Sequence, residues 1–264
     1  MPTILLTKIG TLYNFTAENE WFMDSTLNCD HYEENGWKLI ENQLVSDDIS
    51  LWVDEVLTPN KEGDCRLHFH EDIDGENKPH RVERFLEDHK NLHQLITTGL
   101  IPEIASFLHK SKVHIYKEKI NCKMPNGAGY APHQDAAAYD KHINFITCLI
   151  AVDDMNEDNG CIQFSTVNPI SLLETDKFGC IIDTDLIWKS VSMKKGDILF
   201  FSSLLPHKSG CNYSSKMRRA IYLTYNSISD GDLRTHYYNN RIPETTNLNR
   251  VSNIGHFQGT VIKG

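Results

Sequence analysis

Three residues that are far apart in the sequence, His133, Asp135 and His207, could together bind a metal ion. His133 and Asp135 lie two positions apart, and side chains with this spacing point to the same side of an extended strand. A third ligand is available in His207, which ends the stretch FFSSLLPH at residues 200–207. Two histidines and one carboxylate on one side of a metal ion, with the other positions open, describe a non-haem Fe(II) oxygenase site. The alternative is a strand histidine that is hydrogen-bonded to a nearby acid.

An arginine downstream of the second histidine strengthens the enzymatic interpretation. Arg218 comes eleven positions after His207 and precedes a strand of alternating apolar residues. From the start of that strand its guanidinium can reach into a barrel and bind a dicarboxylate through two parallel hydrogen bonds.

With these residues the sequence resembles the phytanoyl-CoA dioxygenase family of Fe(II)/2-oxoglutarate oxygenases, and the similarity runs from about residue 32 to residue 241. The stretches KEKINCKMPNGAGYAPHQDAAAY, DDMNEDNGC and RRAIYLTYNSISDGDLRTHYYNNR resemble the bacterial branch that hydroxylates aminoalkylphosphonates. The resemblance implies hydroxylation of 2-aminoethylphosphonate or its trimethylated analogue. It also implies Fe(II) as cofactor and 2-oxoglutarate and O2 as cosubstrates, with ascorbate in support.

The resemblance further implies roles for single residues. Metal binding and catalysis fall to His133, Asp135 and His207; 2-oxoglutarate binding to Arg218, Thr147, Asn121 and Ser209; and substrate contacts to Lys119, Tyr130, Gln134 and Tyr139. Alternatives stay open for some of them. Thr147 could bond to backbone, either tyrosine could be barrel packing, and strand alternation turns Gln134 away from its neighbours, which favours a structural role. Residues 165–169, STVNP, depart from the family pattern and leave substrate contacts from that turn open.

The segment from residue 113 to 123 alternates with a period of two. One face would carry Val113, Ile115, Lys117, Lys119, Asn121 and Lys123, and the other Glu118, Ile120 and Cys122. Three lysines and an amide on one face fit either an interior that holds anions or a face that is exposed to solvent. Arg81 and Glu83 are similarly open between a surface ion pair and a pocket lining.

The element pattern predicts a mainly β protein with a helical N-terminal third. Helices are expected at 30–36, at 46–57 with Ser46 as cap, at 84–96 and from Pro102 onward, and strands at 4–6 and 37–40. Residues 59–80 are polar and turn-rich, and the cluster HFHED within them reads as a surface loop rather than a second metal site. Many short strands after residue 111 predict a double-stranded β-helix, the cupin-like jelly roll, buttressed by helices.

A single dioxygenase domain is expected over residues 1–264. It would consist of a helical part to about 110, a jelly-roll core over about 111–226 and an extension over 227–264. In the extension Arg234, Tyr237, Tyr238 and Arg241 could cover the mouth of the pocket, or their helix could pack on the barrel. A lid is expected around 187–188. The roles of residues 1–29 and of the last twenty residues stay open.

Composition narrows the class of protein. The formal net charge is −10, from 26 basic and 36 acidic residues, with no basic patch, so nucleic acid is not an expected partner. Seven scattered cysteines without a Cys-x-x-Cys pair argue against disulfides and zinc ribbons. The longest apolar run, 143–152, is about half a membrane span, and the N-terminus lacks the features of a signal peptide. We therefore expect a soluble cytoplasmic enzyme with a small-molecule substrate, of undetermined oligomeric state.

Two alternatives remain at this stage. The same chemistry could act on an amino acid, a secondary metabolite or an acyl-CoA, although no basic groove of the size of CoA is evident. From another class, the chain could be a non-catalytic, cupin-like binding protein.

Overall fold

The computed structural model describes residues 30–41, 44, 48–59, 65–139, 143–244 and 256–263, and shows two facing antiparallel sheets with helices outside the larger one. The main sheet has the order β1 (Trp37–Ile40), β9 (Ile198–Ser202), β6 (Phe145–Ala151), β11 (Arg218–Ser227), β4 (Val113–Lys123), β3 (Glu76–Glu83), β2 (Leu67–Ile73) and β12 (Thr260–Lys263). The smaller sheet has the order β5 (Tyr130–His133), β10 (His207–Ser209), β7 (Ile162–Ser165) and β8 (Trp188–Ser190). The predicted jelly roll with a mainly β composition is confirmed.

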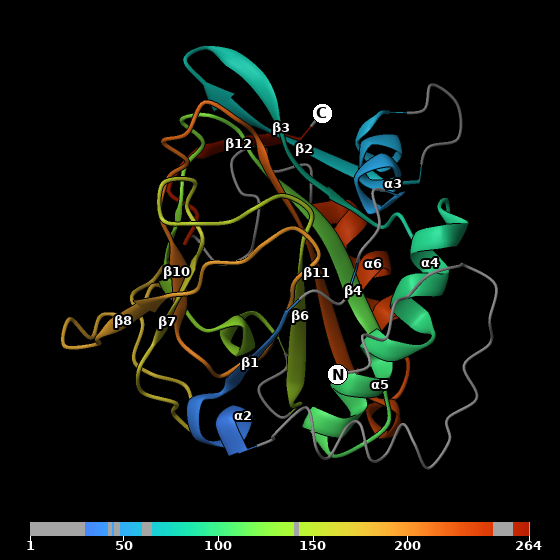
Figure 1. Ribbon diagram of the computed structural model, residues 1–264, viewed down its shortest axis with the longest axis vertical. Coiled ribbons are helices and arrows are strands. Elements are labelled where there is room, and N and C mark those ends of the chain that lie inside the picture. Colours follow the sequence, from blue (N-terminus) through green and yellow to red (C-terminus); the bar gives the residue numbers. More distant parts are fainter. Residues whose placement is uncertain are drawn as a thin grey trace.

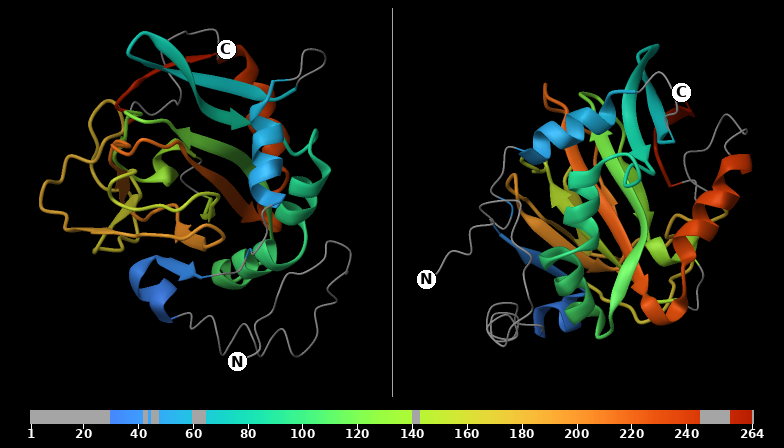
Figure 2. Two further views of the ribbon diagram at one scale, coloured as in Figure 1. Left: turned by 45° about the horizontal axis from the view of Figure 1, so that its top comes forward. Right: turned by 90° about the vertical axis from the view of Figure 1, so that its right-hand side faces the viewer.

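Helices cover the outer face of the main sheet. They are α2 (Asp30–Asn35), α3 (Asp48–Leu57), α4 (Lys90–Thr97), α5 (Leu100–His109) and α6 (Leu233–Glu244), with short 3₁₀ turns η1 (Asp135–Ala138) and η2 (Ile228–Asp230). Figure 1 shows α3, α4 and α5 on one side of the main sheet and β7, β8 and β10 on the other. In the right panel of Figure 2 these three helices cross in front of the strands, with α6 (orange-red) to one side. Among the described residues no helix has the length and apolar character needed to cross a bilayer.

Strand alternation divides the apolar side chains between two cores. On β6, Ile146, Cys148 and Ile150 pack toward the helices, whereas Leu149 and Ala151 pack between the sheets. The first core also receives the buried stripes of α3 and α5. All seven residues of β6 are buried, as befits a central strand with a covered face on both sides. Because both faces are covered, side chains directed between the sheets are shielded from bulk water.

The main difference between the predicted and observed helices is the residue at which α4 begins. The helix predicted from Pro102 onward is α5, and its buried residues are Ile101, Ile104, Ala105 and Leu108. The helix predicted from residue 84 begins only at Lys90, because β3 runs to Glu83 and Arg84 takes a left-handed backbone conformation with φ 58°. His89 then caps α4, its side chain accepting a hydrogen bond from Leu92 N. The expected strand 4–6 and the Ser46 cap lie outside the described residues.

The segment expected to be a polar surface loop is a β-hairpin instead. β2 and β3 pair from Leu67↔Glu83 to Ile73↔Glu76 and extend the main sheet. The turn places Asp74 and Gly75 at φ 55° and 81°, the pair of positive values that tight hairpins require, and Gly75 N donates to Asp72 Oδ1 at 2.9 Å. Asp72, Asp74 and Gly75 therefore form the turn of this hairpin.

A β-bulge corrects the alternation predicted for β4. Thr224 of β11 pairs with Lys117, but its neighbour Tyr225 pairs with Ile115, so Tyr116 is an extra residue. Before the bulge, Val113 and Ile115 pack with the helix-side core. After it, Lys117, Lys119, Asn121 and Lys123 face the space between the sheets, while Glu118, Ile120 and Cys122 face the helices. The shared face predicted for Val113, Ile115 and the lysines is therefore wrong, because the bulge shifts the alternation by one residue.

Two further strands belong to these sheets. The strand predicted after Arg218, β11, lies at the centre of the main sheet between β6 and β4. In the connection 170–190, Trp188 belongs to β8, which pairs with β7, rather than to a free lid, while Ile187 is exposed. The six cysteines within the described residues are all free.

Candidate active site

His133, Asp135 and His207 meet between the two sheets. β5 and β10 pair so that His207 lies directly opposite His133, with ring centroids 4.2 Å apart. Asp135 Oδ1 lies 4.0 Å from Nε2 of each histidine. One donor atom from each of the three residues falls within 4.8 Å of the others, which makes them the one cluster of this kind in the described part of the chain. HFHED forms no such cluster there.

Asp135 reaches this point by a route that the strand argument did not predict. β5 ends at His133, and Asp135 is the first residue of η1 rather than a strand residue. Ala136 N donates to Ser203 O at 2.9 Å, which ties this turn to the loop before β10. Thr147 Oγ1 lies 3.4 Å from Asp135 Oδ2 and donates to it, so in this structure it bonds neither to backbone nor into the carboxylate cavity.

Both imidazoles are oriented by backbone carbonyls. His133 Nδ1 lies 2.7 Å from Ala131 O, and His207 Nδ1 lies 2.9 Å from Leu205 O. A carbonyl oxygen can only accept, so each Nδ1 carries the proton and each Nε2 presents a lone pair on the side of Asp135. This is the outer hydrogen bond that metal-binding histidines commonly make.

The electrostatics of the cluster favour neutral imidazoles beside an ionised carboxylate. Burial lowers the pKa of His133 well below its usual value, and the neighbouring His256 and His207 lower it further. Burial also lowers the pKa of His207, against the opposing effect of Asp135. For Asp135, burial alone would raise the pKa, but His207, Lys119 and Lys117 outweigh it and hold the pKa below its usual value. Metal ligands need these protonation states.

A second feature is a small cavity beside the cluster, between the sheets. It is lined by His80, Asn121, Cys122, Lys123, Ala128, Tyr130, Ser209, Arg218 and Tyr222. Arg218 is 3% exposed and donates from Nη2 to Gly160 O at 2.8 Å, while its Nε is buried without a hydrogen-bond partner. Asn121 Oδ1 is also buried and unpartnered. Three of the four residues predicted to bind 2-oxoglutarate, Arg218, Asn121 and Ser209, therefore line this cavity. The fourth, Thr147, lies instead beside Asp135 in the cluster of His133, Asp135 and His207, which we call the metal cluster.

Lys123, which the sequence analysis gave no role of its own, ties the two sheets together at this cavity. Its Nζ donates to Ser209 Oγ at 3.0 Å, to Gly210 O at 2.5 Å and to Gly160 O at 3.3 Å. A Cβ on Gly160, whose φ is 70°, would lie 2.9 Å from Lys123 Nζ. Burial, together with the nearby Arg218, lowers the pKa of Lys123 well below its usual value. The signal for Lys123 in the sequence was only its place on the lysine face.

The residues predicted to contact substrate separate into three situations. Tyr130 lines the cavity, with its hydroxyl 3.1 Å from His80 Nε2. Tyr139 packs edge-on against Tyr116 and Phe145, and Lys117 Nζ lies 4.3 Å from the centre of its ring. Lys119 Nζ lies 5.1 Å from the ring of Tyr222 and acts on Asp135 electrostatically.

Gln134 is the exception, because its amide is fully used by the backbone of two loops. Its Nε2 donates to Ser171 O and Leu204 O, and its Oε1 accepts from Leu173 N. The side chain is wholly buried. These contacts support the structural alternative for Gln134 and give no support to a substrate role.

His256 is a residue of this site that the sequence analysis missed. Its ring stacks on that of His133, with centroids 3.7 Å apart and an angle of 12° between the planes. It comes from the C-terminal segment, 123 positions after His133 by the numbering, and no motif or spacing pointed to it. Only the pairing of this segment with β5 and β2 brings it here.

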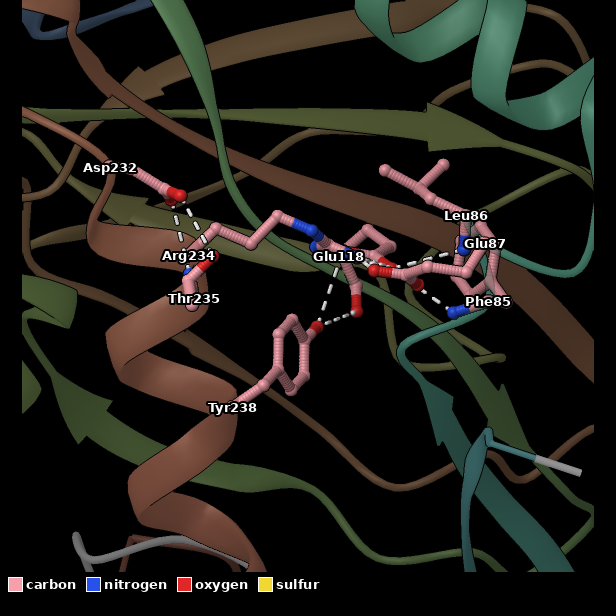
Figure 3. A network of polar contacts seen from close by, with 8 residues as sticks. All are labelled: Phe85, Leu86, Glu87, Glu118, Asp232, Arg234, Thr235 and Tyr238. Carbon is pink, nitrogen blue, oxygen red and sulfur yellow. Dashed lines mark hydrogen bonds and ion pairs between the residues drawn. The ribbon is translucent and has the colours of Figure 1, made fainter.

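The helix α6 packs on the main sheet rather than contributing its arginine to the pocket. Arg234 Nη1 and Nη2 donate to the two oxygens of the buried Glu118, and Nη2 also binds Glu87 (Figure 3). Tyr238 Oη donates to Glu118 Oε2 at 3.2 Å. Of the two alternatives for this segment, packing is observed for Arg234 and Tyr238. The side chain of Arg241 lies outside the described residues.

Residues 28–220 match the model of the family described as phytanoyl-CoA dioxygenase (PhyH). The chain belongs to this family. The match covers His133, Asp135, His207 and Arg218, so the family resemblance is confirmed over most of the chain. The chain is an Fe(II)/2-oxoglutarate-dependent dioxygenase, and the non-catalytic alternative is set aside.

Two relatives in this family are enzymes of phosphonate metabolism by name. A methylphosphonate hydroxylase of Gimesia maris is 40% identical over 256 residues, which cover 91% of this chain and 97% of the relative. A 2-aminoethylphosphonate dioxygenase from an uncultured bacterium is 32% identical over 221 residues, covering 80% and 84%. These similarities place the chain beside the phosphonate branch of the family.

Solved structures agree on the fold. EctD from S. alaskensis, determined with 2-oxoglutarate and 5-hydroxyectoine, superposes with a TM-score of 0.63 at 15% identity, covering 76% of this chain and 75% of EctD. The carbocyclase SnoK of nogalamycin biosynthesis gives a TM-score of 0.62 at 21% identity, covering 83% and 87%.

Proposed function

We propose that this dioxygenase hydroxylates a small alkylphosphonate at the carbon that bears phosphorus. The observation that carries the proposal is the 40% identity to a methylphosphonate hydroxylase over nearly the whole length of both chains. Cationic side chains on the inner face of β4 supply the charge that a phosphonate needs. In this reaction one oxygen atom of O2 enters the C–H bond of the substrate, and the other enters 2-oxoglutarate, which leaves as succinate and CO2.

His133, Asp135 and His207 would hold the iron. Their donor atoms converge, both imidazoles are held with Nε2 free, and a carboxylate completes a facial set, which fits a ferrous ion with open positions. Bound Fe(II) and 2-oxoglutarate supply the oxidising chemistry. The surrounding residues hold these three side chains in place. The carbonyls of Ala131 and Leu205 orient the two imidazole rings, and Thr147 donates a hydrogen bond to Asp135 Oδ2.

Arg218 would bind the distal carboxylate of 2-oxoglutarate. Its Nε is a buried donor without a partner, and such a group is costly unless a ligand pairs with it. Ser209 and Asn121 line the same cavity and can complete the carboxylate's hydrogen bonds. Ascorbate would support turnover by keeping the iron ferrous.

The aromatic rings of Tyr139 and Tyr237 favour methylphosphonate over substrates that carry a quaternary ammonium group. The rings of Tyr139 and Tyr237 lie 4.3 and 5.6 Å from the ammonium of Lys117, so the protein's own cation occupies the faces on which a substrate cation would stack. Tyr130 packs among His133, His256 and Phe257. We rank methylphosphonate first and 2-aminoethylphosphonate second, because the relative named for the first is 40% identical to this chain and the relative named for the second is 32% identical.

The test is succinate release from 2-oxoglutarate with Fe(II), ascorbate and a panel of substrates. The panel contains methylphosphonate, 2-aminoethylphosphonate, its trimethylated analogue, an amino acid and an acyl-CoA. We expect the greatest stimulation with methylphosphonate, with hydroxymethylphosphonate as product by ³¹P NMR. Stimulation by the amino acid or acyl-CoA alone would refute the phosphonate assignment and keep the dioxygenase chemistry.

A further inference from the structure

The C-terminal segment 256–263 crosses from the small sheet to the main sheet beside the metal cluster. His256 O accepts from Ala131 N at 2.8 Å, Gln258 N donates to Gly129 O at 3.1 Å, and Phe257 forms a bridge with Tyr130. The chain then continues into β12, which pairs with β2. This segment, which we call the strap, is therefore held by backbone hydrogen bonds at both ends.

The strap fits closely against its neighbours. The ring of Phe257 lies 4.5 Å from that of His80 and 5.0 Å from that of Tyr130. A Cβ on Gly259 would lie 2.5 Å from Glu71 Oε1 and 2.8 Å from the Cβ of Ala128. The place of His256 in the site is thus fixed by the packing of the residues that follow it.

His256 presents a buried polar group in this place. The residue is 8% exposed, and its Nδ1 is buried without a hydrogen-bond partner. A buried polar atom of this kind costs free energy unless a ligand or water pairs with it. The stack on His133 places the ring one van der Waals layer away from a predicted iron ligand.

Cations lie near this ring. Burial lowers the pKa of His256 to about 3, and Lys119 and Arg81 are among the charges that lower it further, against the opposing effect of Asp135. Arg81 is 5% exposed on β3, opposite Asn121 of β4, and Glu83 lies opposite Lys119. Glu83 Oε1 is 3.0 Å from Arg81 Nε, so Arg81 and Glu83 form an ion pair.

This position differs from that of the carboxylate cavity. Neither Arg81, Lys119 nor His256 lines the cavity around Arg218. An enzyme that binds a dicarboxylate and a phosphonate together needs two separate positions for anions. The structure offers the second position at the strap.

We propose that His256, delivered by the strap, is a substrate-binding residue that donates a hydrogen bond to a phosphonate oxygen. The inference rests on the proposed function for the identity of the substrate. A phosphonate held beside the stacked rings has its adjacent carbon next to the metal cluster. Such an arrangement selects short substrates, because the anion site and the reacting position are separated by little more than one ring.

The experiment compares His256→Phe with His256→Asn and with His93→Phe. Phenylalanine keeps the stack on His133 and removes the donor, whereas asparagine restores an amide nitrogen near the position of Nδ1. His93, exposed on α4, is the control for the same substitution elsewhere. Binding of methylphosphonate and of inorganic phosphate is measured by anaerobic calorimetry on protein loaded with Fe(II) and 2-oxoglutarate.

We expect His256→Phe to raise the Kd for methylphosphonate by about 10- to 100-fold, the usual effect of losing a hydrogen bond to a charged group. His256→Asn recovers part of this loss, His93→Phe binds like the wild type, and the Kd for 2-oxoglutarate stays within about twofold in all variants.

Three results separate the ways in which the idea can fail. Unchanged methylphosphonate binding in His256→Phe overturns the role of His256 and leaves the proposed function standing. Equal weakening of Fe(II) or 2-oxoglutarate binding shows that His256 acts only through His133, which also overturns it. Phosphate binding that depends on His256, in a protein whose turnover no phosphonate stimulates, supports the anion site and refutes the proposed function.

Discussion

The two faces of β4 hold polar side chains in contrasting ways. Toward the helices, Glu118 is wholly buried and accepts from the backbone N–H groups of Phe85 and Leu86 as well as from Arg234 and Tyr238 (Figure 3). Toward the small sheet, the same strand presents lysines and Asn121, among them a buried amide oxygen without a partner. We call the side toward the helices the closed face, because the carboxylate of Glu118 has hydrogen-bond partners there. We call the side toward the small sheet the open face, because it holds a buried polar atom without a partner.

This contrast distinguishes structural from functional polarity. A buried acid whose lone pairs are all used contributes to the packing of α6 and of the turn before α4. Buried donors and acceptors that remain open, as at Arg218 and His256, are retained at a cost to stability and indicate where a ligand completes them. Substitutions on the open face should therefore change binding and activity, and substitutions on the closed face should change stability.

The largest effect is expected at Asp135 on the open face. Asp135→Ala removes the one carboxylate among the three converging ligands, so we expect Fe(II) affinity and turnover to fall by more than about 100-fold. Calorimetric titration with Fe(II) under anaerobic conditions measures the affinity. Glu87→Ala, which removes an acid near the closed face, is the control and should bind iron normally. Retention of iron affinity by Asp135→Ala would refute the assignment of the metal site.

Next is Glu118 on the closed face. Glu118→Ala leaves two backbone N–H groups and part of Arg234 without their acceptor, and breaking a buried pair from one side costs about 3–5 kcal/mol of the free energy of unfolding. The lower end applies, because Glu87 still binds Arg234. Urea denaturation measures this loss, and the KM for 2-oxoglutarate of the folded fraction should stay unchanged. A large rise in that KM would mean that the two faces are not independent.

Adjacent arginines on opposite faces give the closest matched pair. Arg218→Lys loses the planar donor set for the distal carboxylate, and we expect the KM for 2-oxoglutarate to rise by about 10- to 100-fold. Arg219→Lys makes the same change on the outer face, where Arg219 binds Asp153 and Asp54. Steady-state kinetics should show little change in KM for Arg219→Lys. Equal rises in both variants would count against the cavity as the 2-oxoglutarate site.

The smallest effect is a pH dependence of stability from His80. Burial lowers the pKa of His80, against the opposing effect of Glu71, so the unfolded chain binds this proton more readily than the folded one. Stability then rises with pH through the window between the lowered folded pKa and the unfolded value of about 6.5, and is lost as the pH falls through that window. Urea denaturation of the metal-free protein at several pH values should show a shallower loss for His80→Gln than for the wild type. An identical slope would exclude His80 as a contributor.

Much of the site could be predicted from the sequence because the residues that would bind the metal sit in short, recognisable patterns. His133 and Asp135 lie two positions apart. Arg218 begins a strand with regular apolar alternation, and this strand pairs antiparallel with both of its neighbours. The parts that escaped prediction depend on long-range pairing. His256 reaches the cluster because a terminal strand pairs with a hairpin, and that hairpin is formed by residues whose polarity suggested a loop. Asp135 was predicted as a ligand, but on an extended strand, and a 3₁₀ turn delivers it instead.

The bulge at Tyr116 makes the length of β4 as important as its composition. Deleting this single residue would force the chain to choose between two incompatible arrangements. In the first, the lysines still face the space between the sheets, and Val113 and Ile115 turn away from the apolar side chains of α5. In the second, Val113 and Ile115 still pack against α5, and the lysine side chains point into the helix-side core. An in-frame loss of one codon here would therefore damage the enzyme more than most replacements of the same residue.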